Sequence, residues 1–133
     1  MTAEELIAKA NEARELAYCP YSGFQVGAAL ECEDGTIYKG CNIENAAYGP
    51  SNCAERTAIF KAVSEGQKSF KKIAIVGGHK GESVAPTPCG VCRQVLAEFC
   101  DPDLKIIMAK DENDYEVMTL GELLPRGFSL ELN

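Results

Sequence analysis

Helical and strand-like patterns alternate along this sequence, and the alternation restricts its fold more than any other feature does. Residues 3–18 carry apolar side chains at helical spacing, and Thr2 and Glu5 have the three-residue offset of a capping box. Residues 25–33 and 36–42 are strand-like and are joined by an Asp-Gly turn, a strong signal for a hairpin. The first part of the chain is therefore expected to form one helix followed by two antiparallel strands.

The remaining sequence continues this alternation. Its expected elements are a helix from about Cys53, capped by Asn52 or Ser51, to just before Gly66, a strand over 72–77, a loop over 77–88, a helix over 89–100 with Pro88 in its first turn, strands over 105–109 and 115–118, and a short helix over 120–124. Strands that alternate with helices predict an α/β fold, in which helices cover a mixed sheet. A chain of 133 residues has the size of one domain, so residues 1–133 are expected to form a single domain.

Charge and hydropathy exclude several classes of partner. The net charge of -7 and the pI near 4.7 are the opposite of the basic surface that binds a nucleic acid backbone. No apolar stretch approaches the roughly 20 residues of a membrane helix. The first residues are acidic, where a secretory signal would be basic. We therefore expect a cytoplasmic protein that binds neither a nucleic acid polymer nor a membrane.

Cysteine is unusually frequent here, and its seven copies are an odd number, which excludes a complete set of intrachain disulfides. In a reducing compartment such cysteines indicate metal ligands, catalytic thiols or small buried residues. Cys89 and Cys92 form a Cys-x-x-Cys pair, whose two thiols can converge on one tetrahedral metal ion. A redox pair or two buried cysteines are the alternatives. A thioredoxin-like pair directly follows a strand, whereas a proline-rich loop precedes this one, and metal binding is favoured accordingly.

Cys53 is the expected third ligand because, like Cys89, it begins a predicted helix. Backbone N–H groups and the helix dipole stabilise a thiolate at that position. Three thiolates leave the fourth position of zinc to water, as in catalytic sites, whereas a structural site needs a fourth protein ligand. The single histidine, His79, lies in a predicted loop and is interpreted as a surface residue. We interpret the other cysteines as structural: Cys19, Cys32, Cys41 and Cys100.

Two charged residues follow Cys53 closely. Glu55 is near enough to reach a water on the same metal ion, and a carboxylate there can move the proton that zinc releases from its water. A capping box between Asn52 and Glu55 explains the same residue equally well. Arg56 lies on the helix face of Cys53, where its guanidinium could donate to thiolate sulfurs and reduce their basicity. A solvated surface arginine is the alternative.

Taken together, these segments resemble the signature of the zinc deaminases. The sequence is similar to the small cytidine deaminases with three cysteine ligands over nearly its whole length, in the segments 20–29, 40–48, 53–56, 88–94 and 122–125. This resemblance implies a three-layer cytidine deaminase-like fold, with a mixed five-stranded sheet and helices on both faces. It also implies one Zn²⁺ per subunit, Glu55 as general acid and base, and the hydrolysis of cytidine and deoxycytidine to uridine, deoxyuridine and ammonia in pyrimidine salvage.

The resemblance also implies which residues bind the nucleoside. Asn42 and Glu44 would hold the ribose hydroxyls, because an amide and a carboxylate supply the required donor and acceptors. Phe24 would pack on the pyrimidine, as an aromatic face suits a flat base, and the backbone near Ala54 and Cys89 would bind the base edge. The segment from Asn42 to Tyr48 favours cytidine, and Tyr48 is counted among the substrate-binding residues. A loop-capping asparagine and a solvated glutamate are the structural alternatives for Asn42 and Glu44.

Assembly is a further implication of the resemblance. Members of this family are typically homotetramers, in which a C-terminal aromatic residue approaches the site of a neighbouring subunit. Phe128 occupies the corresponding stretch of this chain. Its alternative role is to anchor the tail on its own subunit.

Three other functions stay open from the sequence. A deaminase of a modified cytosine nucleoside, such as a nucleoside antibiotic, would share the zinc signature. A structural zinc module would fill the fourth metal position with a protein ligand, and a redox protein would join Cys89 and Cys92 reversibly. A deoxycytidylate deaminase would need positive groups for the phosphate, and the sequence has no obvious cluster of them. The sequence leaves the preference between cytidine and deoxycytidine undecided.

Overall fold

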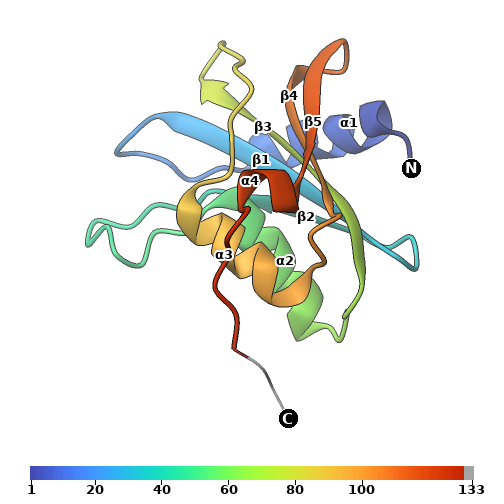
Figure 1. The fold of residues 1–133 in the computed structure, drawn as a ribbon. Helices are drawn as coiled ribbons and strands as arrows, with labels where there is room; N and C mark the ends of the chain where they lie inside the picture. The colour runs from blue at the N-terminus through green and yellow to red at the C-terminus, as the bar shows by residue number, and fades with distance from the viewer. Residues whose placement is uncertain (131–133) are drawn as a thin grey trace.

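The computed structural model describes residues 1–130, which form one five-stranded sheet and four helices (Figure 1). The strands lie in the order β2-β1-β3-β4-β5, and β3 and β4 are the parallel pair. In chain order the elements are α1 (Ala3–Arg14), β1 (Phe24–Cys32), β2 (Ile37–Cys41), α2 (Ala54–Ser64), β3 (Phe70–His79), α3 (Gly90–Phe99), β4 (Lys105–Asp111), β5 (Asp114–Thr119) and α4 (Leu120–Leu123). The predicted mixed sheet of five strands is confirmed.

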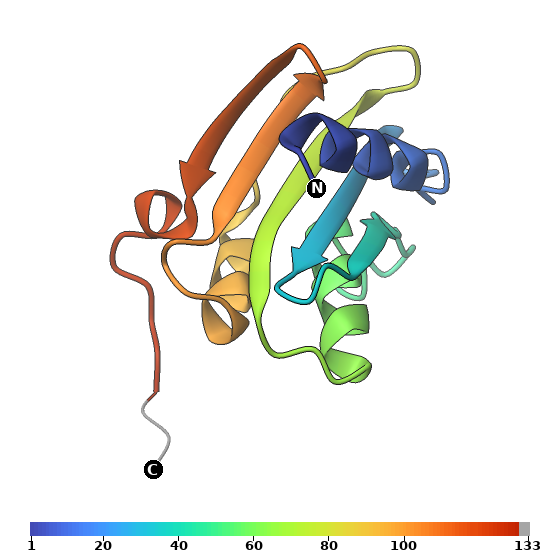
Figure 2. The ribbon, with the colours of Figure 1, turned by 90° about the vertical axis from the view of Figure 1, so that its right-hand side faces the viewer.

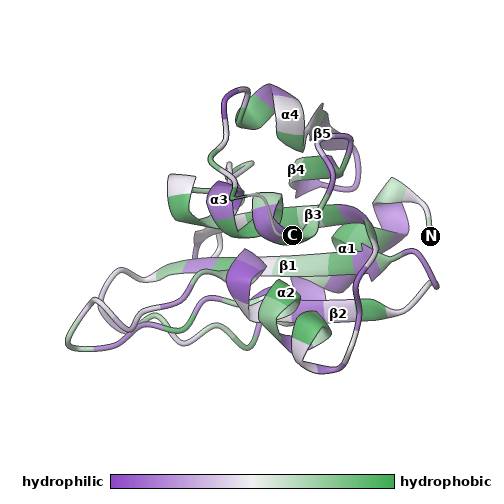
Figure 3. Ribbon diagram, turned by 60° about the horizontal axis from the view of Figure 1, so that its bottom comes forward, coloured by the Kyte–Doolittle hydropathy of each residue, from purple (hydrophilic) through white to green (hydrophobic). Residues whose placement is uncertain are grey.

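Helices cover both faces of this sheet, which gives the molecule three layers (Figure 2). Successive side chains of a strand point to opposite faces, and β3 is buried on both. Ala74 and Val76 pack with α1 on one face, whereas Ile73 and Ile75 pack with α2 and α3 on the other. Figure 3 shows the hydrophobic middle of β3 and the mixed surfaces of the helices that cover it. The expected placement of helices on both faces is therefore confirmed.

The first two strands form the predicted hairpin around Asp34 and Gly35. The Asp34 carboxylate accepts a hydrogen bond from the backbone N–H of Thr36 at 2.9 Å, and Gly35 takes a positive φ of 89°. Such a φ strains any residue with a Cβ, so glycine suits this turn. Because the two strands are antiparallel, the hairpin brings Phe24, at the start of β1, and Asn42, just after β2, to the same end of the sheet.

The first helix is shorter than the sequence predicts. Its capping box at Thr2 and Glu5 is present, but it ends at Arg14 instead of residue 18. Leu16, which completes the apolar pattern, is 77% exposed. Tyr18 instead donates its N–H to the carbonyl oxygen of Asn42 and bridges Ile43. Tertiary pairing of this segment has replaced the last helical turn.

Helices α2 and α3 each begin one residue later than expected. The N-cap of α2 is Cys53, not Asn52 or Ser51, and the N-cap of α3 is Cys89. Pro88 therefore lies before the cap, not in the first turn. Strand β3 also extends past the predicted residue 77 to His79, because β1 pairs with it as far as Phe24.

The sequence predicts no helix that spans a membrane. Within residues 1–130, no helix is long and apolar enough to cross a bilayer.

Candidate active site

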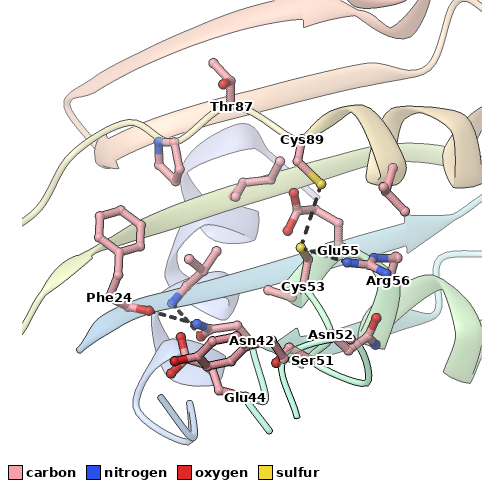
Figure 4. Close-up of a pocket in the computed structure, with 17 residues that line it drawn as sticks. Phe24, Asn42, Glu44, Ser51, Asn52, Cys53, Glu55, Arg56, Thr87 and Cys89 are labelled. Atoms are coloured by element: carbon pink, nitrogen blue, oxygen red, sulfur yellow. Dashed lines mark hydrogen bonds between the residues drawn. The ribbon is translucent and has the colours of Figure 1, made fainter. Parts of the chain in front are cut away.

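Three thiols meet where the N-termini of α2 and α3 approach each other, and Figure 4 shows two of them, Cys53 and Cys89. The sulfur atoms of Cys53, Cys89 and Cys92 all lie within 4.8 Å of one another. Cys53 and Cys89 are the two N-cap residues, and Cys92 lies one turn into α3. The structure thus brings together the three residues that the sequence suggests as metal ligands, from segments 36 residues apart.

The arrangement of these thiols fits a zinc ion. Tetrahedral zinc holds thiolate sulfurs at about 2.3 Å, which places two such sulfurs about 3.8 Å apart. The distance between Cys53 Sγ and Cys89 Sγ is 3.8 Å. Among the described residues, no histidine or carboxylate joins this cluster as a fourth ligand. The donor set therefore matches a zinc site with one open position.

Charged and polar neighbours favour the thiolate form of Cys53. Its sulfur accepts a hydrogen bond from Arg56 Nη2 at 3.1 Å. The Cys92 thiol and this guanidinium together hold the pKa of Cys53 below its usual value, against the opposing effect of burial. The guanidinium contact expected from the sequence is therefore present. Arg56 Nε is buried and has no hydrogen-bond partner among the described residues.

Glu55 is almost fully buried, with 4% of its surface exposed, and it borders the same cavity as Cys53 and Cys89. Desolvation raises the pKa of its carboxyl group from 4.5 to about 7. A carboxyl group with a pKa near neutrality can both accept and donate a proton at physiological pH. The capping-box explanation of Glu55 is wrong, because Cys53 is the N-cap and the Asn52 side chain donates to Thr57 instead.

A cavity of about 530 Å³ opens beside the thiols and Glu55. Its volume is in the range of small-molecule sites in proteins. It is lined by Phe24, Val26, Asn42, Glu44, Tyr48, Gly49, Ser51, Asn52, Cys53, Ala54, Glu55, Arg56, Ile75, Pro86, Thr87, Cys89 and Val91. All of the substrate-binding residues that the sequence suggests, except Phe128, border this one space.

The amide of Asn42 is held by backbone groups at the start of β1. Its Oδ1 accepts from the N–H of Val26 at 2.8 Å, and its Nδ2 donates to the carbonyl of Phe24 at 2.8 Å. The loop-capping alternative is therefore also realised. An amide oxygen accepts two hydrogen bonds and an amide nitrogen donates two, so Asn42 keeps one donor and one acceptor for another partner.

Glu44 is fixed in the same way by the segment before β1. Its carboxylate accepts from the backbone N–H groups of Tyr21 at 3.0 Å and Ser22 at 3.1 Å. The Ser22 hydroxyl also donates to it and, as the largest contribution, lowers the pKa of Glu44 below its usual value. At neutral pH the cavity therefore presents an oriented, ionised acceptor.

Phe128 lies apart from this cavity in its own chain. Its side chain is 67% exposed, and its backbone carbonyl accepts a hydrogen bond from Gln94 Nε2 at 2.8 Å. Its suggested role at a neighbouring site stays a prediction.

The remaining cysteines and His79 lie outside the thiol cluster. Cys19, Cys32, Cys41 and Cys100 are free thiols. His79 packs its ring edgewise on Phe24, with ring centroids 5.4 Å apart and an interplanar angle of 90°. Its ring thus supports a cavity residue without ligating the metal.

Sequence reasoning missed several residues of the cavity wall. Ser51 and Asn52 come directly before Cys53, and Pro86 and Thr87 come shortly before Cys89. Residues that precede a ligand at a helix N-terminus share its position in space, so adjacency to the ligands was the signal that could have found them.

Three convergent thiols beside a buried acid, at a cavity of about 530 Å³, are the arrangement expected of a metal-dependent hydrolytic enzyme. The family model "Cytidine and deoxycytidylate deaminase zinc-binding region" matches residues 1–108. The chain belongs to this family of zinc-binding deaminases, and the resemblance seen in the sequence is confirmed.

Individual relatives agree with this family. A protein named cytidine deaminase from Sporosarcina psychrophila is 55% identical, over 98% of this chain and 94% of that protein. The crystal structure of cytidine deaminase from Burkholderia pseudomallei superposes with a TM-score of 0.89 at 47% identity, covering 96% of this chain and 100% of the other. A more distant relative, named blasticidin-S deaminase, from Bacillus cereus, is 32% identical over 75% of this chain and 74% of that protein.

Proposed function

We propose that this chain hydrolyses the 4-amino group of cytidine and deoxycytidine, which yields uridine or deoxyuridine and ammonia. The observation that carries the proposal is the buried Glu55 carboxyl group beside three convergent thiols in a cavity of about 530 Å³. Relatives named cytidine deaminase that match the chain almost end to end support it. On this proposal, residues 1–133 form one catalytic domain.

Cys53, Cys89 and Cys92 would hold one zinc ion per chain. When bound there, zinc supplies a Lewis acid that brings the pKa of a water molecule to about 7 and makes it a nucleophile at neutral pH. The three thiolates and the divalent ion sum to one negative charge, which the Arg56 guanidinium at 3.1 Å from Cys53 Sγ offsets. Drawing electron density from this thiolate keeps the metal a strong Lewis acid.

Glu55 would move the protons of the reaction. Its carboxylate takes a proton from the attacking water and passes it to N3 of the pyrimidine, which makes C4 more electrophilic. It then takes the proton of the new hydroxyl group at C4 and gives it to the amine, so that the C4–N bond breaks, ammonia leaves and the C4 carbonyl of the uridine product forms. Burial raises the pKa of this carboxyl group to about 7, and both transfers are therefore accessible at neutral pH.

The other cavity residues would orient the nucleoside. Phe24 would pack on the pyrimidine face, and the backbone near Ala54 would bind its polar edge. The free donor and acceptor of Asn42 and the ionised Glu44 would bind the ribose hydroxyls, with Tyr48 closing the cavity beside them. Tyr48 has a positive φ of 63°, so this part of the loop is held in an unusual backbone conformation.

Charge in the cavity favours a nucleoside over a nucleotide. Of the described residues that line it, Arg56 is the only cation, and its guanidinium is committed to Cys53. Glu44 also lines an adjoining hollow that contains no lysine or arginine among the described residues. A 5′-phosphate would face a carboxylate without a compensating cation, so we expect cytidine 5′-monophosphate to be a poor substrate.

The wider setting follows the family resemblance. We expect a cytoplasmic homotetramer that acts in pyrimidine salvage, with Phe128 of one subunit reaching the cavity of another. The exposure of Phe128 on the surface of its own chain supports this arrangement.

The test is the fall in ultraviolet absorbance when zinc-loaded protein is mixed with cytidine, with the zinc content measured on the same sample. A rapid fall that stops on chelation is expected, with a much slower reaction of cytidine 5′-monophosphate. Blasticidin S is the comparison substrate, because one relative carries that name. Turnover of blasticidin S without turnover of cytidine would replace the proposed substrate, and one zinc per chain without turnover of either compound would indicate a structural site.

A further inference from the structure

The hydroxyl group of Thr57 connects both halves of the candidate active site. It lies 3.0 Å from the carbonyl oxygen of Cys41 and 3.2 Å from that of Cys53, and it accepts from Asn52 Nδ2 at 3.2 Å. Cys41 directly precedes Asn42, which borders the nucleoside cavity, and Cys53 is a proposed zinc ligand. One side chain therefore contacts the end of β2, the following loop and the start of α2.

The Cys41 carbonyl is a backbone acceptor without a strand partner. β2 is an edge strand of the sheet. The N–H of Asn42 donates to Val26 on β1 at 3.2 Å, and alternate residues of a strand direct their backbone groups to opposite sides. The carbonyl of Cys41 therefore points away from β1, where the Thr57 hydroxyl reaches it.

A single hydroxyl proton cannot serve both carbonyls fully. The Cys53 carbonyl already accepts the backbone N–H of Thr57 at 3.0 Å, in the normal i to i+4 pattern. We therefore assign the hydroxyl proton to the hydrogen bond with the carbonyl oxygen of Cys41. This assignment makes the contact a bond between α2 and β2, beyond the local bond that a helical threonine commonly forms to its own helix.

Helix α2 also needs support at its N-terminus. Among the four helices within residues 1–130, α2 is the one whose N-cap side chain forms no hydrogen bond to its helix. The Cys53 sulfur instead faces Cys89 and Arg56. Cys53 thus forms no capping bond, unlike Cys89 at the N-cap of α3, and a group other than the N-cap side chain holds the entry to α2.

We propose that Thr57 is a positioning residue. Its hydroxyl fixes the position of the Cys53 ligand relative to the Asn42 side of the nucleoside cavity. It touches neither metal nor substrate and acts through Cys41, Asn52 and Cys53. The substrate half of this inference rests on the proposed function, whereas the zinc half does not.

The test compares T57V, which removes the hydroxyl and keeps the branched shape, with T57S, which keeps the hydroxyl. Zinc affinity is measured by competition with a chelator, and KM and kcat are measured with cytidine. Groups that orient metal ligands typically change metal affinity by 10- to 100-fold. T57V is expected to lose about tenfold in zinc affinity. When it is saturated with zinc, its KM should rise at least fivefold, a larger change than that in kcat. The zinc affinity and KM of T57S should stay within about threefold of those of the unmodified protein.

The matched control is T119V, which removes the hydroxyl that caps α4 away from the cavity. It is expected to lower the urea midpoint of unfolding, as the loss of an N-cap does, without changing zinc affinity or KM. Should T57V not fold, T57A removes the same hydroxyl and is compared with T57S in its place.

Three results would overturn the inference. In the first, T57V has the zinc affinity and KM of the unmodified protein. In the second, T57S loses as much zinc affinity and raises KM as much as T57V does. In the third, T119V loses as much zinc affinity as T57V. If the unmodified protein does not deaminate cytidine, the proposed function fails, and the zinc affinities of the same variants still decide the role of Thr57.

Discussion

At the scale of single residues, burial of Glu55 is the feature that most affects the chemistry. Helix α2 places this carboxyl group beneath the cavity, and desolvation raises its pKa to about 7. A surface glutamate with a pKa near 4.5 would be ionised at neutral pH and would hold no proton to donate to the departing amine. The same burial has a cost in stability.

This cost predicts a pH-dependent stability of the metal-free protein. Well below pH 4.5, Glu55 is protonated in the folded and unfolded states and does not affect the free energy of unfolding. As the pH rises towards 7 the unfolded state ionises first, so the folded state loses stability, by about 1.4 kcal/mol for each unit of pKa difference. Replacement by glutamine removes this loss.

We therefore expect the stability advantage of E55Q over the unmodified metal-free protein to be about 3 kcal/mol larger at pH 8 than at pH 4.5. Urea unfolding of both proteins at the two pH values measures this difference. An advantage that does not change with pH would show that Glu55 is not desolvated in the folded state.

The sequence was sufficient to predict the site residues that stand in short, recognisable motifs. Cys89 and Cys92 stand in a recognisable pair, and Cys53 and Glu55 follow the deaminase signature. It was insufficient for Thr57, because a threonine inside a helix has no pattern that reveals an edge-strand carbonyl beside it. Contacts between segments far apart in sequence depend on the assembled sheet.

At the scale of elements, the site depends on how closely α2 approaches β2. A Cβ at Gly40 would lie 2.5 Å from the carbonyl oxygen of Ala54 and 2.6 Å from the nitrogen of Ala58. Because Ala54 follows Cys53 directly, the glycine in β2 sets the position of the helix that carries the ligand and the acid. Packing of the helix backbone against this glycine is thus part of the site.

G40A is therefore expected to displace α2, to lower the free energy of unfolding by about 1–3 kcal/mol and to weaken zinc binding. Denaturant unfolding and chelator competition measure the two effects. In G90A the new Cβ would meet nothing within 4 Å, so its stability should stay close to that of the unmodified protein. Equal stability of G40A and G90A would contradict the close approach of α2.

The end of α1 is bound to the end of β3 by a second contact between elements. Arg14 is buried, and its Nη2 donates to the carbonyl of Gly78 at 3.0 Å and to that of His79, the residue that packs on Phe24, at 3.1 Å. R14M would leave the buried carbonyl of Gly78 without its charged donor, which costs about 1–3 kcal/mol. Hydrogen exchange of residues 78–84 should then accelerate, whereas the exposed Arg126 should tolerate R126M within about 0.5 kcal/mol. Unchanged exchange in R14M would rule out this anchoring role.

Element boundaries show where sequence patterns lose their predictive value. The apolar spacing of 3–18 is genuine, yet the last turn is absent because Tyr18 pairs with the loop at Ile43. Likewise, two glycines suggested a loop at the end of β3, but pairing with β1 continues through both to His79. In each case a partner distant in sequence overrides local preference.

At the scale of the whole molecule, the arrangement in three layers was predictable from the sequence. Strands and helices alternate along the chain, and the strands that form the core are rich in apolar residues. Large apolar side chains such as Phe60, Val117 and Phe128 are nevertheless exposed on the single chain. Their exposure is consistent with the proposed tetramer, which would cover some of them.

Sedimentation equilibrium is expected to give a mass about four times the 14.3 kDa of one chain. F128A should retain its zinc and raise KM for cytidine if the residue reaches a neighbouring cavity. A monomer at high concentration would contradict the assembly, and an unchanged KM in tetrameric F128A would confine Phe128 to its own subunit.

The most direct test of the account is the turnover of cytidine by E55Q, with its zinc content measured on the same sample. Glutamine keeps the shape of the buried side chain but cannot carry a proton between water, ring and amine. We expect E55Q to retain about as much zinc as the unmodified protein and to lose at least about 10²-fold in kcat, the lower end of the contribution of general acid–base catalysis. A nearly normal rate in zinc-loaded E55Q would contradict the role of Glu55 and, with it, the proposed chemistry of the site.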